Sequence, residues 1–179
     1  MPRSGAWLLG AGAAALLLIA SSSAQAATPS PEESPRWPHP PLAGKVRLGS
    51  PFGWRVDPVR GGQQHHDGLD LPAPAGTPVY APEAGVVDRV DRDGVGRGVS
   101  TGNAVFLRAE SRRWAFFHLS SVEVAVGARV TRGQRIGAVG STGKSTGAHL
   151  HLQAWDSAGK LVDPVVQFAP DTFAPRRSA

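Results

Sequence analysis

From Lys45 onward, short apolar runs alternate along the chain with clusters of Gly, Pro, Asp and Asn. Runs of strand length that are separated by such turn residues indicate an antiparallel all-β domain. No stretch beyond residue 26 has a sustained apolar period of about 3.6 residues, so we expect little helix. The predicted strands are Gly68–Leu71, Val86–Val90, Ala104–Arg108, Trp114–Leu119, Arg135–Val139 and His149–Trp155.

The first 26 residues have the layout of a secretory signal peptide. Arg3 precedes an apolar run, Ala6–Ala20, and the small residues Ala24 and Ala26 then mark a cleavage site. A membrane anchor would need roughly 20 apolar residues, and this run is shorter. We therefore expect export with cleavage, and no membrane span in the mature chain.

The composition on either side of the predicted strands sets the domain bounds. Residues 27–44 are rich in Pro and Ser, which predicts an extended linker. Residues 169–179 carry Pro and Arg without an apolar pattern, which predicts a flexible tail. One domain, residues 45–168, remains between them.

Composition and charge restrict the chemistry. The chain has no cysteine, which excludes thiol catalysis, cysteine zinc sites and lipid attachment through an N-terminal cysteine. Lys and Arg (19) exceed Asp and Glu (14), for a formal charge of +5. Such a field favours anionic partners such as cell-wall polymers, although dispersed arginines also serve solubility alone. Because no basic stripe is present, the sequence does not predict a nucleic-acid partner.

The first candidate metal ligands are His66 and Asp70. If Gly68–Leu71 is a strand, alternation places Asp70 and Gly68 on one face, with His66 at the entrance on the same face. Gly68 would then leave room for an ion, and both flanking side chains can bind zinc. The neighbouring His65 competes with His66, but the His-x-x-x-Asp spacing favours His66. Alone, such a spacing is more often a surface turn.

The remaining histidines of the domain lie in two later strands. His149 and His151 project to one face of their strand while Leu150 enters the core. His118 ends an apolar segment, where an isolated histidine is more often a packed, hydrogen-bonded residue. Two histidines and one carboxylate with an open position form the coordination of a catalytic zinc. The surplus histidines suit general bases or transition-state stabilisers.

The order and spacing of these groups resemble the lysostaphin-type (LytM-like) zinc metallopeptidases of peptidoglycan. The resemblance covers roughly residues 49–168 and rests on several separate segments. These are Ser50–Pro58, His66–Asp70, Gly85–Val87, Gly102–Asn103, Phe117–Leu119, Gly140–Gly143, Ser145–Gly147, His149–His151 and Val162–Pro164.

The resemblance implies a role for each candidate residue. His66, Asp70 and His151 would bind Zn²⁺, while His118 and His149 would be the catalytic pair beside the attacking water and the developing oxyanion. The implied fold is a compact antiparallel β-sheet domain of duplicated hybrid (barrel-sandwich) type with a zinc groove. The implied activity is endopeptidase cleavage of peptidoglycan cross-links in the periplasm or cell envelope, with stem peptides as substrate.

The chain departs from the family pattern at three positions near the site. Gln153 stands where Glu is frequent, Phe116 where an aromatic hydroxyl is frequent, and Ala148 where Pro is common. None of them removes a ligand, so the departures concern the surroundings of the site.

Two other functions fit parts of the pattern. A catalytically silent relative that activates cell-wall amidases would have lost the metal ligands, which are all present here. A carrier module would need a modifiable lysine at a hairpin tip, and Lys144 lies in the Gly-rich loop instead. Of the two bonds cut by the family, the D-alanyl cross-link and the glycine bridge, we expect the first. The sequence names no protein regulator.

Overall fold

The computed structural model describes residues 37–56, 61–93, 95 and 98–174. The chain divides into two units, Met1–Ser34 and Pro35–Ala179, and the described residues all belong to the second. The predicted signal peptide lies outside the described residues. No helix in the described ranges combines the length and apolar character needed to cross a membrane.

Strands are the main regular element of the described structure. Within the described ranges, helical structure is limited to α1 (Gly98–Thr101) and a 3₁₀ helix, η2 (Val165–Gln167). The strands are β1 (Val46–Arg47), β2 (Gly53–Val56), β3 (Gln63–His66), β4 (Leu69–Pro72), β5 (Pro78–Tyr80), β6 (Gly85–Asp91), β7 (Asn103–Ala109), β8 (Arg112–Val122), β9 (Arg129–Val130), β10 (Arg135–Val139), β11 (His149–Asp156), β12 (Leu161–Val162) and β13 (Phe173–Ala174).

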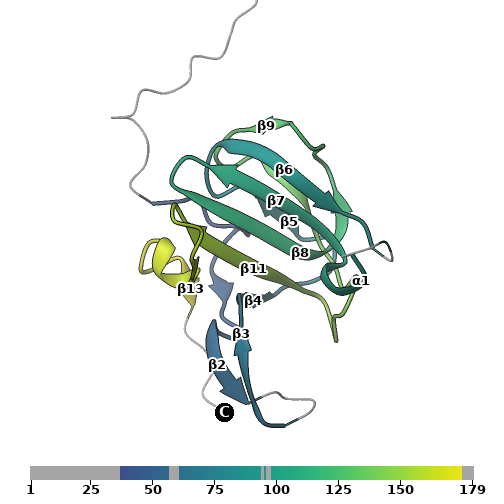
Figure 1. Cartoon of the computed structure of the whole chain (residues 1–179), viewed down its shortest axis with the longest axis vertical. Helices are drawn as coiled ribbons and strands as arrows, with labels where there is room; N and C mark the ends of the chain where they lie inside the picture. The colour runs from purple at the N-terminus through teal and green to yellow at the C-terminus, as the bar shows by residue number, and fades with distance from the viewer. Residues whose placement is uncertain (1–36, 57–60, 94, 96–97, 175–179) are drawn as a thin grey trace, which may run out of the picture. The chain divides into compact units, whose positions relative to one another are not determined.

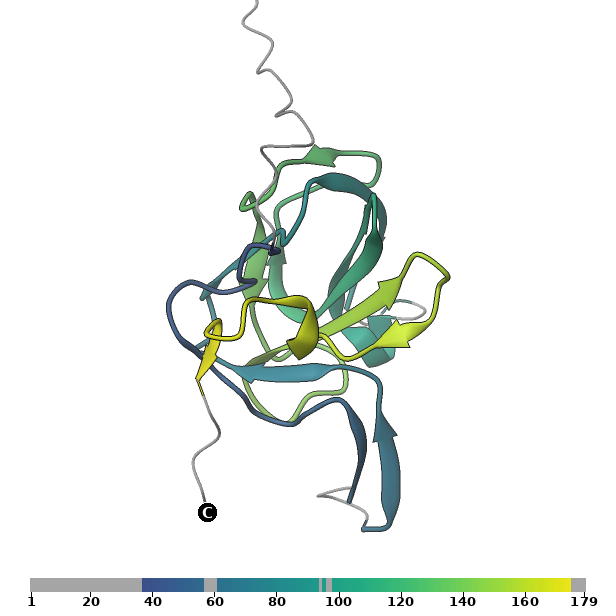
Figure 2. The same ribbon diagram turned by 90° about the vertical axis from the view of Figure 1, so that its left-hand side faces the viewer.

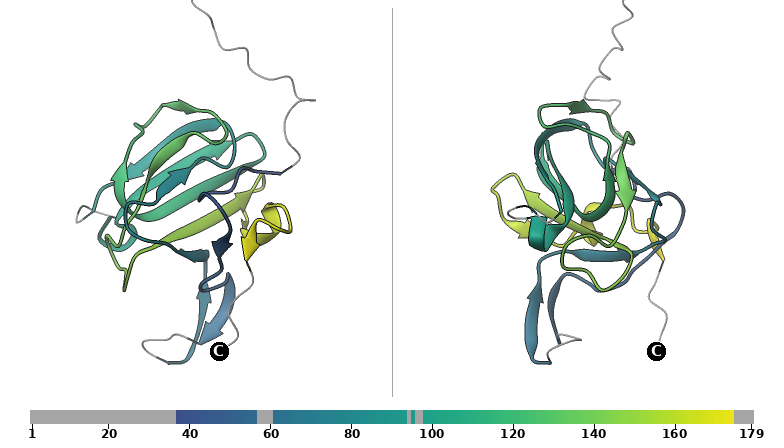
Figure 3. Two further views of the ribbon diagram at one scale, coloured as in Figure 1. Left: turned by 180° about the vertical axis from the view of Figure 1, so that it is seen from behind. Right: turned by 90° about the vertical axis from the view of Figure 1, so that its right-hand side faces the viewer.

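One large antiparallel sheet carries the domain. Its strand order is β12-β11-β8-β7-β6-β9, with β4 added to β11 and with β10 paired to both β8 and β5. Figure 1 shows β6, β7, β8 and β11 side by side, and Figures 2 and 3 show that this sheet is strongly curved. The predicted antiparallel all-β class is confirmed.

The inner face of the curved sheet is apolar. The largest side chains without exposed surface are Trp114 and Phe116 of β8, and the Trp114 indole N–H donates to Glu83 Oε2 at 2.9 Å. The inward positions of β4 and β11 add four leucines: Leu69, Leu71, Leu150 and Leu152. Because side chains alternate, the same two strands turn their polar residues to the opposite face.

Each predicted strand is present, and Arg135–Val139 has the predicted bounds. The β2–β3 hairpin was not predicted. Its sequences, GWRV and QQHH, are half-exposed on a two-stranded sheet of their own, so no apolar alternation marks them. Figures 1 to 3 show the hairpin projecting from the large sheet.

Packed structure extends beyond residues 45–168 at both ends. Leu42, within the segment predicted as a linker, is buried in the core, and the His39 N–H donates to the carbonyl of Pro82. Strand β13, within the segment predicted as a tail, pairs in parallel with β1. The Phe173 ring also contacts Phe168, with centroids 5.2 Å apart.

Candidate metal centre

Strands β4 and β11 position the polar face of the site. Their register sets His151 opposite Asp70 and Leu150 opposite Leu71. The two leucines have no exposed surface, whereas Asp70, His149 and His151 line a cavity on the other face. The patterns Leu-Asp-Leu and His-Leu-His thus produce a cluster of ligand-type side chains above an apolar layer.

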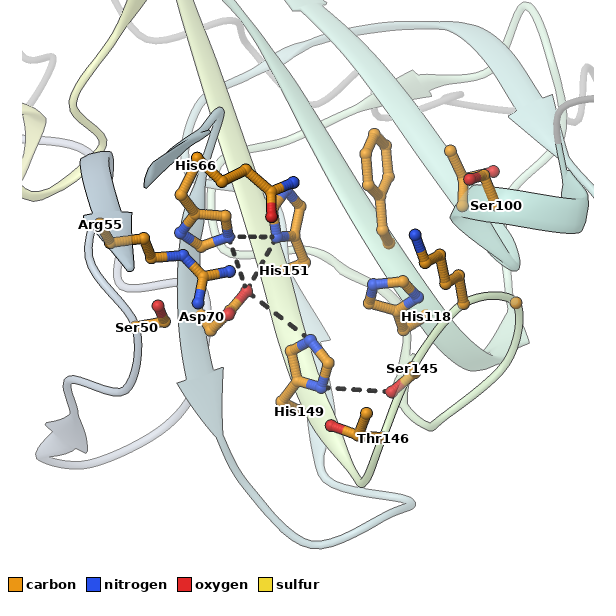
Figure 4. Close-up of a pocket in the computed structure, with 15 residues that line it drawn as sticks. Ser50, Arg55, His66, Asp70, Ser100, His118, Ser145, Thr146, His149 and His151 are labelled. Atoms are coloured by element: carbon orange, nitrogen blue, oxygen red, sulfur yellow. Dashed lines mark hydrogen bonds and ion pairs between the residues drawn. The ribbon is translucent and has the colours of Figure 1, made fainter. Parts of the chain in front are cut away.

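His66, at the end of β3, completes this cluster. Its Nε2 lies 3.2 Å from His151 Nδ1 and 3.3 Å from Asp70 Oδ1, and the last two atoms are 2.8 Å apart (Figure 4). Ligand atoms about 2.0–2.2 Å from a tetrahedral zinc are about 3.4 Å from one another. The three atoms are therefore spaced as ligands of one ion, and a zinc cofactor fits this donor set.

Hydrogen bonds and stacking fix the two imidazoles. His66 Nδ1 lies 2.6 Å from the carbonyl oxygen of Pro51, which can only accept, so the lone pair of Nε2 faces the site. The His151 ring stacks on Phe117, with centroids 5.3 Å apart. Its Nε2 lies 3.2 Å from the side-chain amide nitrogen of Gln153. Because a carboxamide both donates and accepts, Gln153 can hold this ring despite replacing the frequent Glu.

Gly68 lies directly beneath the His151 ring. A Cβ atom at this position would lie 2.5 Å from His151 Nε2 and 2.6 Å from the carbonyl oxygen of Leu152. The missing side chain therefore makes room for the His151 ring, a contact that the sequence did not predict.

His118 and His149 lie together beside these three residues, with ring centroids 4.8 Å apart. The Nδ1 atoms lie 2.8 Å from the carbonyl oxygens of Thr142 and Gly147, respectively. Each Nδ1 therefore carries the proton and donates it to a carbonyl, which leaves Nε2 free to accept one. His149 Nε2 is 3.6 Å from Asp70 Oδ1, so a proton acceptor lies next to the candidate ligands.

His118 occupies a point where the sheet divides. On β8, Phe117 pairs with β11, whereas Leu119 pairs with Val139 of β10. Among the described residues His118 is the one non-glycine with positive φ, at 62°. Such a conformation costs about 1–3 kcal/mol and is found where function constrains the backbone. The left-handed turn redirects β8 between its two partners and presents the His118 ring to the cavity.

Burial and hydrogen bonding set the charges at the site. Burial raises the pKa of Asp70, but its contacts with His151 and His66 outweigh burial and hold this pKa well below its usual range. Burial lowers the pKa of His151, and it lowers the pKa of His118 to about 4. At pH 7, Asp70 is therefore charged and these two histidines are neutral, as metal binding and proton acceptance require.

The cavity above the site has a volume of about 670 Å³. The Gly-rich loop, including Lys144, lines part of it, and the β2–β3 hairpin contributes Arg55 and Gln64. The sequence analysis did not predict that the hairpin lines the cavity. The one local indication is that a polar residue, Arg55, lies between the apolar residues Trp54 and Val56. His65 does not line the cavity; its Nδ1 contacts Asp67 at 2.8 Å.

Residues 64–164 match peptidase family M23. This chain belongs to peptidase family M23. The predicted resemblance to lysostaphin-type metallopeptidases is thereby confirmed. Over 121 residues the M23 chain is 43% identical to DD-carboxypeptidase/endopeptidase Mpg of Neisseria meningitidis serogroup B, covering 67% of this chain and 26% of Mpg. Over 115 residues it is 37% identical to peptidoglycan DD-endopeptidase ShyA of Vibrio cholerae, covering 63% and 26%, respectively. It thus spans about a quarter of the length of these relatives.

Solved M23-like structures have the same fold. A zinc-containing peptidase from Vibrio cholerae superimposes with a TM-score of 0.59 at 31% identity, covering 72% of this chain and 38% of that one. The catalytic domain of lysostaphin from Staphylococcus simulans superimposes with a TM-score of 0.56 at 33% identity, covering 68% and 90%, respectively. The predicted fold resemblance is confirmed by these structures.

Proposed function

We propose that this protein is a zinc-dependent endopeptidase that hydrolyses peptide cross-links of bacterial peptidoglycan. The observation that carries the proposal is the convergence of His66 Nε2, Asp70 Oδ1 and His151 Nδ1 from two distant parts of the chain. The similarity to ShyA, a peptidoglycan DD-endopeptidase, and to Mpg, a DD-carboxypeptidase/endopeptidase, supports this substrate.

His66, Asp70 and His151 would hold the zinc ion through these three atoms. When bound, zinc supplies a Lewis acid that polarises the scissile carbonyl and acidifies a water molecule. The hydrogen bond from His66 to Pro51 and the stacking of His151 on Phe117 keep both rings oriented, so ion binding requires little rearrangement.

His118 and His149 would carry out the proton transfers. Both Nδ1 protons are engaged by backbone carbonyls, so Nε2 of one histidine accepts the proton of the attacking water and passes it to the leaving nitrogen. The other histidine would take up a proton from solvent on Nε2 and, in that form, donate to the oxyanion that develops on the carbonyl oxygen. No covalent intermediate with the protein is required.

The proposal extends to the bond and the compartment. We propose the D-alanyl cross-link as the bond that is cut, as the names of the two relatives support. The signal-peptide layout of residues 1–26 supports export to the periplasm or cell envelope. The positive charge, +5 for the whole chain and +4 once Arg3 leaves with the signal peptide, favours adsorption to an anionic wall.

Digestion of purified cross-linked muropeptides, with products identified by mass, tests the proposal. We expect cross-linked dimers to be converted to monomers, a chelator to stop the reaction, and added zinc to restore it. If the purified protein holds no stoichiometric metal and leaves all dimers intact, the catalytically silent alternative is favoured. Stimulation of an amidase by the same preparation would then support that alternative directly.

A further inference from the structure

The β2–β3 hairpin brings into the groove a charge that the mechanism above does not use. Arg55 on β2 pairs with Gln64 on β3, and both line the cavity. Trp54 and Val56, which flank Arg55 in the sequence, are 73% and 68% exposed. Figure 4 shows the Arg55 side chain reaching toward Asp70. Strand alternation thus delivers one cation to the reaction site.

One nitrogen of this guanidinium has no hydrogen-bond partner in the part of the chain that the structure describes. That nitrogen, Arg55 Nε, is buried. Of the described residues that line the cavity, Asp70 is the one carboxylate, and its Oδ1 is contacted by His151 and His66. Because a buried donor left without a partner is costly, its retention here points to a ligand that accepts from it.

The other cationic side chain that lines the cavity is not buried in this way. Lys144 lines the cavity from the Gly-rich loop but is exposed, so water can satisfy its ammonium group. Arg55 also offers a planar pair of N–H donors, which matches both oxygens of a carboxylate better than an ammonium does. An anionic substrate group close to the scissile bond is therefore expected to bind Arg55.

The cross-links of peptidoglycan differ in whether they offer such a group. In a cross-link between D-alanine and a diamino dicarboxylic acid such as diaminopimelic acid, the carbon that bears the scissile nitrogen also bears a free carboxylate. A terminal D-alanyl–D-alanine has the same arrangement, whereas in a glycine bridge the corresponding carboxyl is already part of the next amide. A cation that binds this carboxylate must lie beside the metal ligands, because the carboxylate is attached to the carbon next to the scissile nitrogen.

We propose that Arg55 binds this free carboxylate and makes the site selective for peptides that carry it. The inference rests on the proposed function, since it concerns the substrate of the same site. It explains how one groove can accept both a D-alanyl cross-link and a terminal D-alanine while discriminating against a glycine bridge.

Two peptides with the same D-alanyl amide test the inference. One carries a free carboxylate next to the scissile nitrogen, and the other carries a carboxamide there. We expect the wild-type protein to prefer the carboxylate peptide by about 10- to 100-fold in kcat/KM. Arg55→Gln should abolish this preference, mainly through KM, while leaving cleavage of the carboxamide peptide and the zinc content unchanged. Arg129→Gln, which alters an exposed arginine of β9 outside the cavity, is the matched control and should behave as wild type.

The outcomes separate this inference from the function on which it rests. Equal cleavage of both peptides by the wild type, or an equal loss for both in Arg55→Gln, would overturn the role of Arg55 and leave the peptidase function intact. Loss of zinc from Arg55→Gln would also overturn it, because the residue would then be structural. A zinc-loaded wild type that cleaves neither peptide nor the cross-linked muropeptides would overturn the proposed function itself.

Discussion

Replacing Gly68 with alanine probes the packing beneath the metal centre. The new Cβ would lie 2.5 Å from His151 Nε2 and 2.6 Å from the carbonyl oxygen of Leu152, well inside an ordinary contact of about 3.5 Å. The carbonyl cannot yield easily, because Leu152 is paired with Leu69 on β4 and with Phe116 on β8. Relief must come largely from movement of the His151 ring.

The size of the effect follows from this overlap. Overpacking of a well-packed site costs about 1–3 kcal/mol. Metal–ligand distances tolerate deviations of only about 0.2 Å, so a ring displaced by several tenths of an ångström is a poorer ligand. If the whole cost falls on the zinc-bound geometry, zinc affinity decreases by about 5- to 150-fold, since about 1.4 kcal/mol corresponds to a factor of ten.

A competition titration with a chelating dye measures this change. We expect Gly68→Ala to bind zinc more weakly by that factor. Gly147→Ala adds the same methyl group where no atom lies within 4 Å, so its zinc affinity should match wild type. Wild-type zinc affinity in Gly68→Ala would refute the idea that the His151 ring occupies the space above this glycine.

Four further substitutions address the ligands, the proton transfers and the core. Asp70→Asn removes the one charged ligand, so metal analysis should find less than one zinc per chain, with activity reduced in proportion; full zinc content would contradict the assignment. His118→Ala and His149→Ala should keep their zinc while kcat decreases by about 10²–10⁴-fold, and loss of the metal would instead make them ligands. Trp114→Ala leaves a cavity and removes the indole donor to Glu83 Oε2, so the free energy of unfolding in urea should decrease by about 3–5 kcal/mol, and a loss below about 1 kcal/mol would contradict its place in the core.

Local sequence patterns predicted the parts of the site that a single strand determines. The alternation His149-Leu150-His151 correctly placed the leucine in the core and the two histidines on the opposite face. The same reasoning placed Asp70 on the polar face of its strand. Alternation succeeds here because each strand has one buried face, which fixes where every second side chain points.

Features that depend on pairing between distant segments were not predictable in this way. His66 Nε2 and His151 Nδ1 meet at 3.2 Å although the residues are 85 positions apart, and only the family resemblance linked them in advance. The role of Gly68 depends on how closely β11 packs against it. The place of Arg55 depends on a polar hairpin whose exposed strands carry no apolar signal. Periodicity along a strand predicts the face to which a side chain points, but not the distant residue that it contacts.

The division of the sheet at His118 has a consequence for how this scaffold can diversify. The pairing of β8 with β10 and its pairing with β11 both end at that point. Gly140 also forms a β-bridge with His149, so the two ends of the segment between these two residues lie side by side. Lengthening such a segment costs little loop-closure entropy. Residues 143–146 could therefore be replaced by grafts of other lengths while all three candidate ligands, which lie outside the segment, keep their backbone positions.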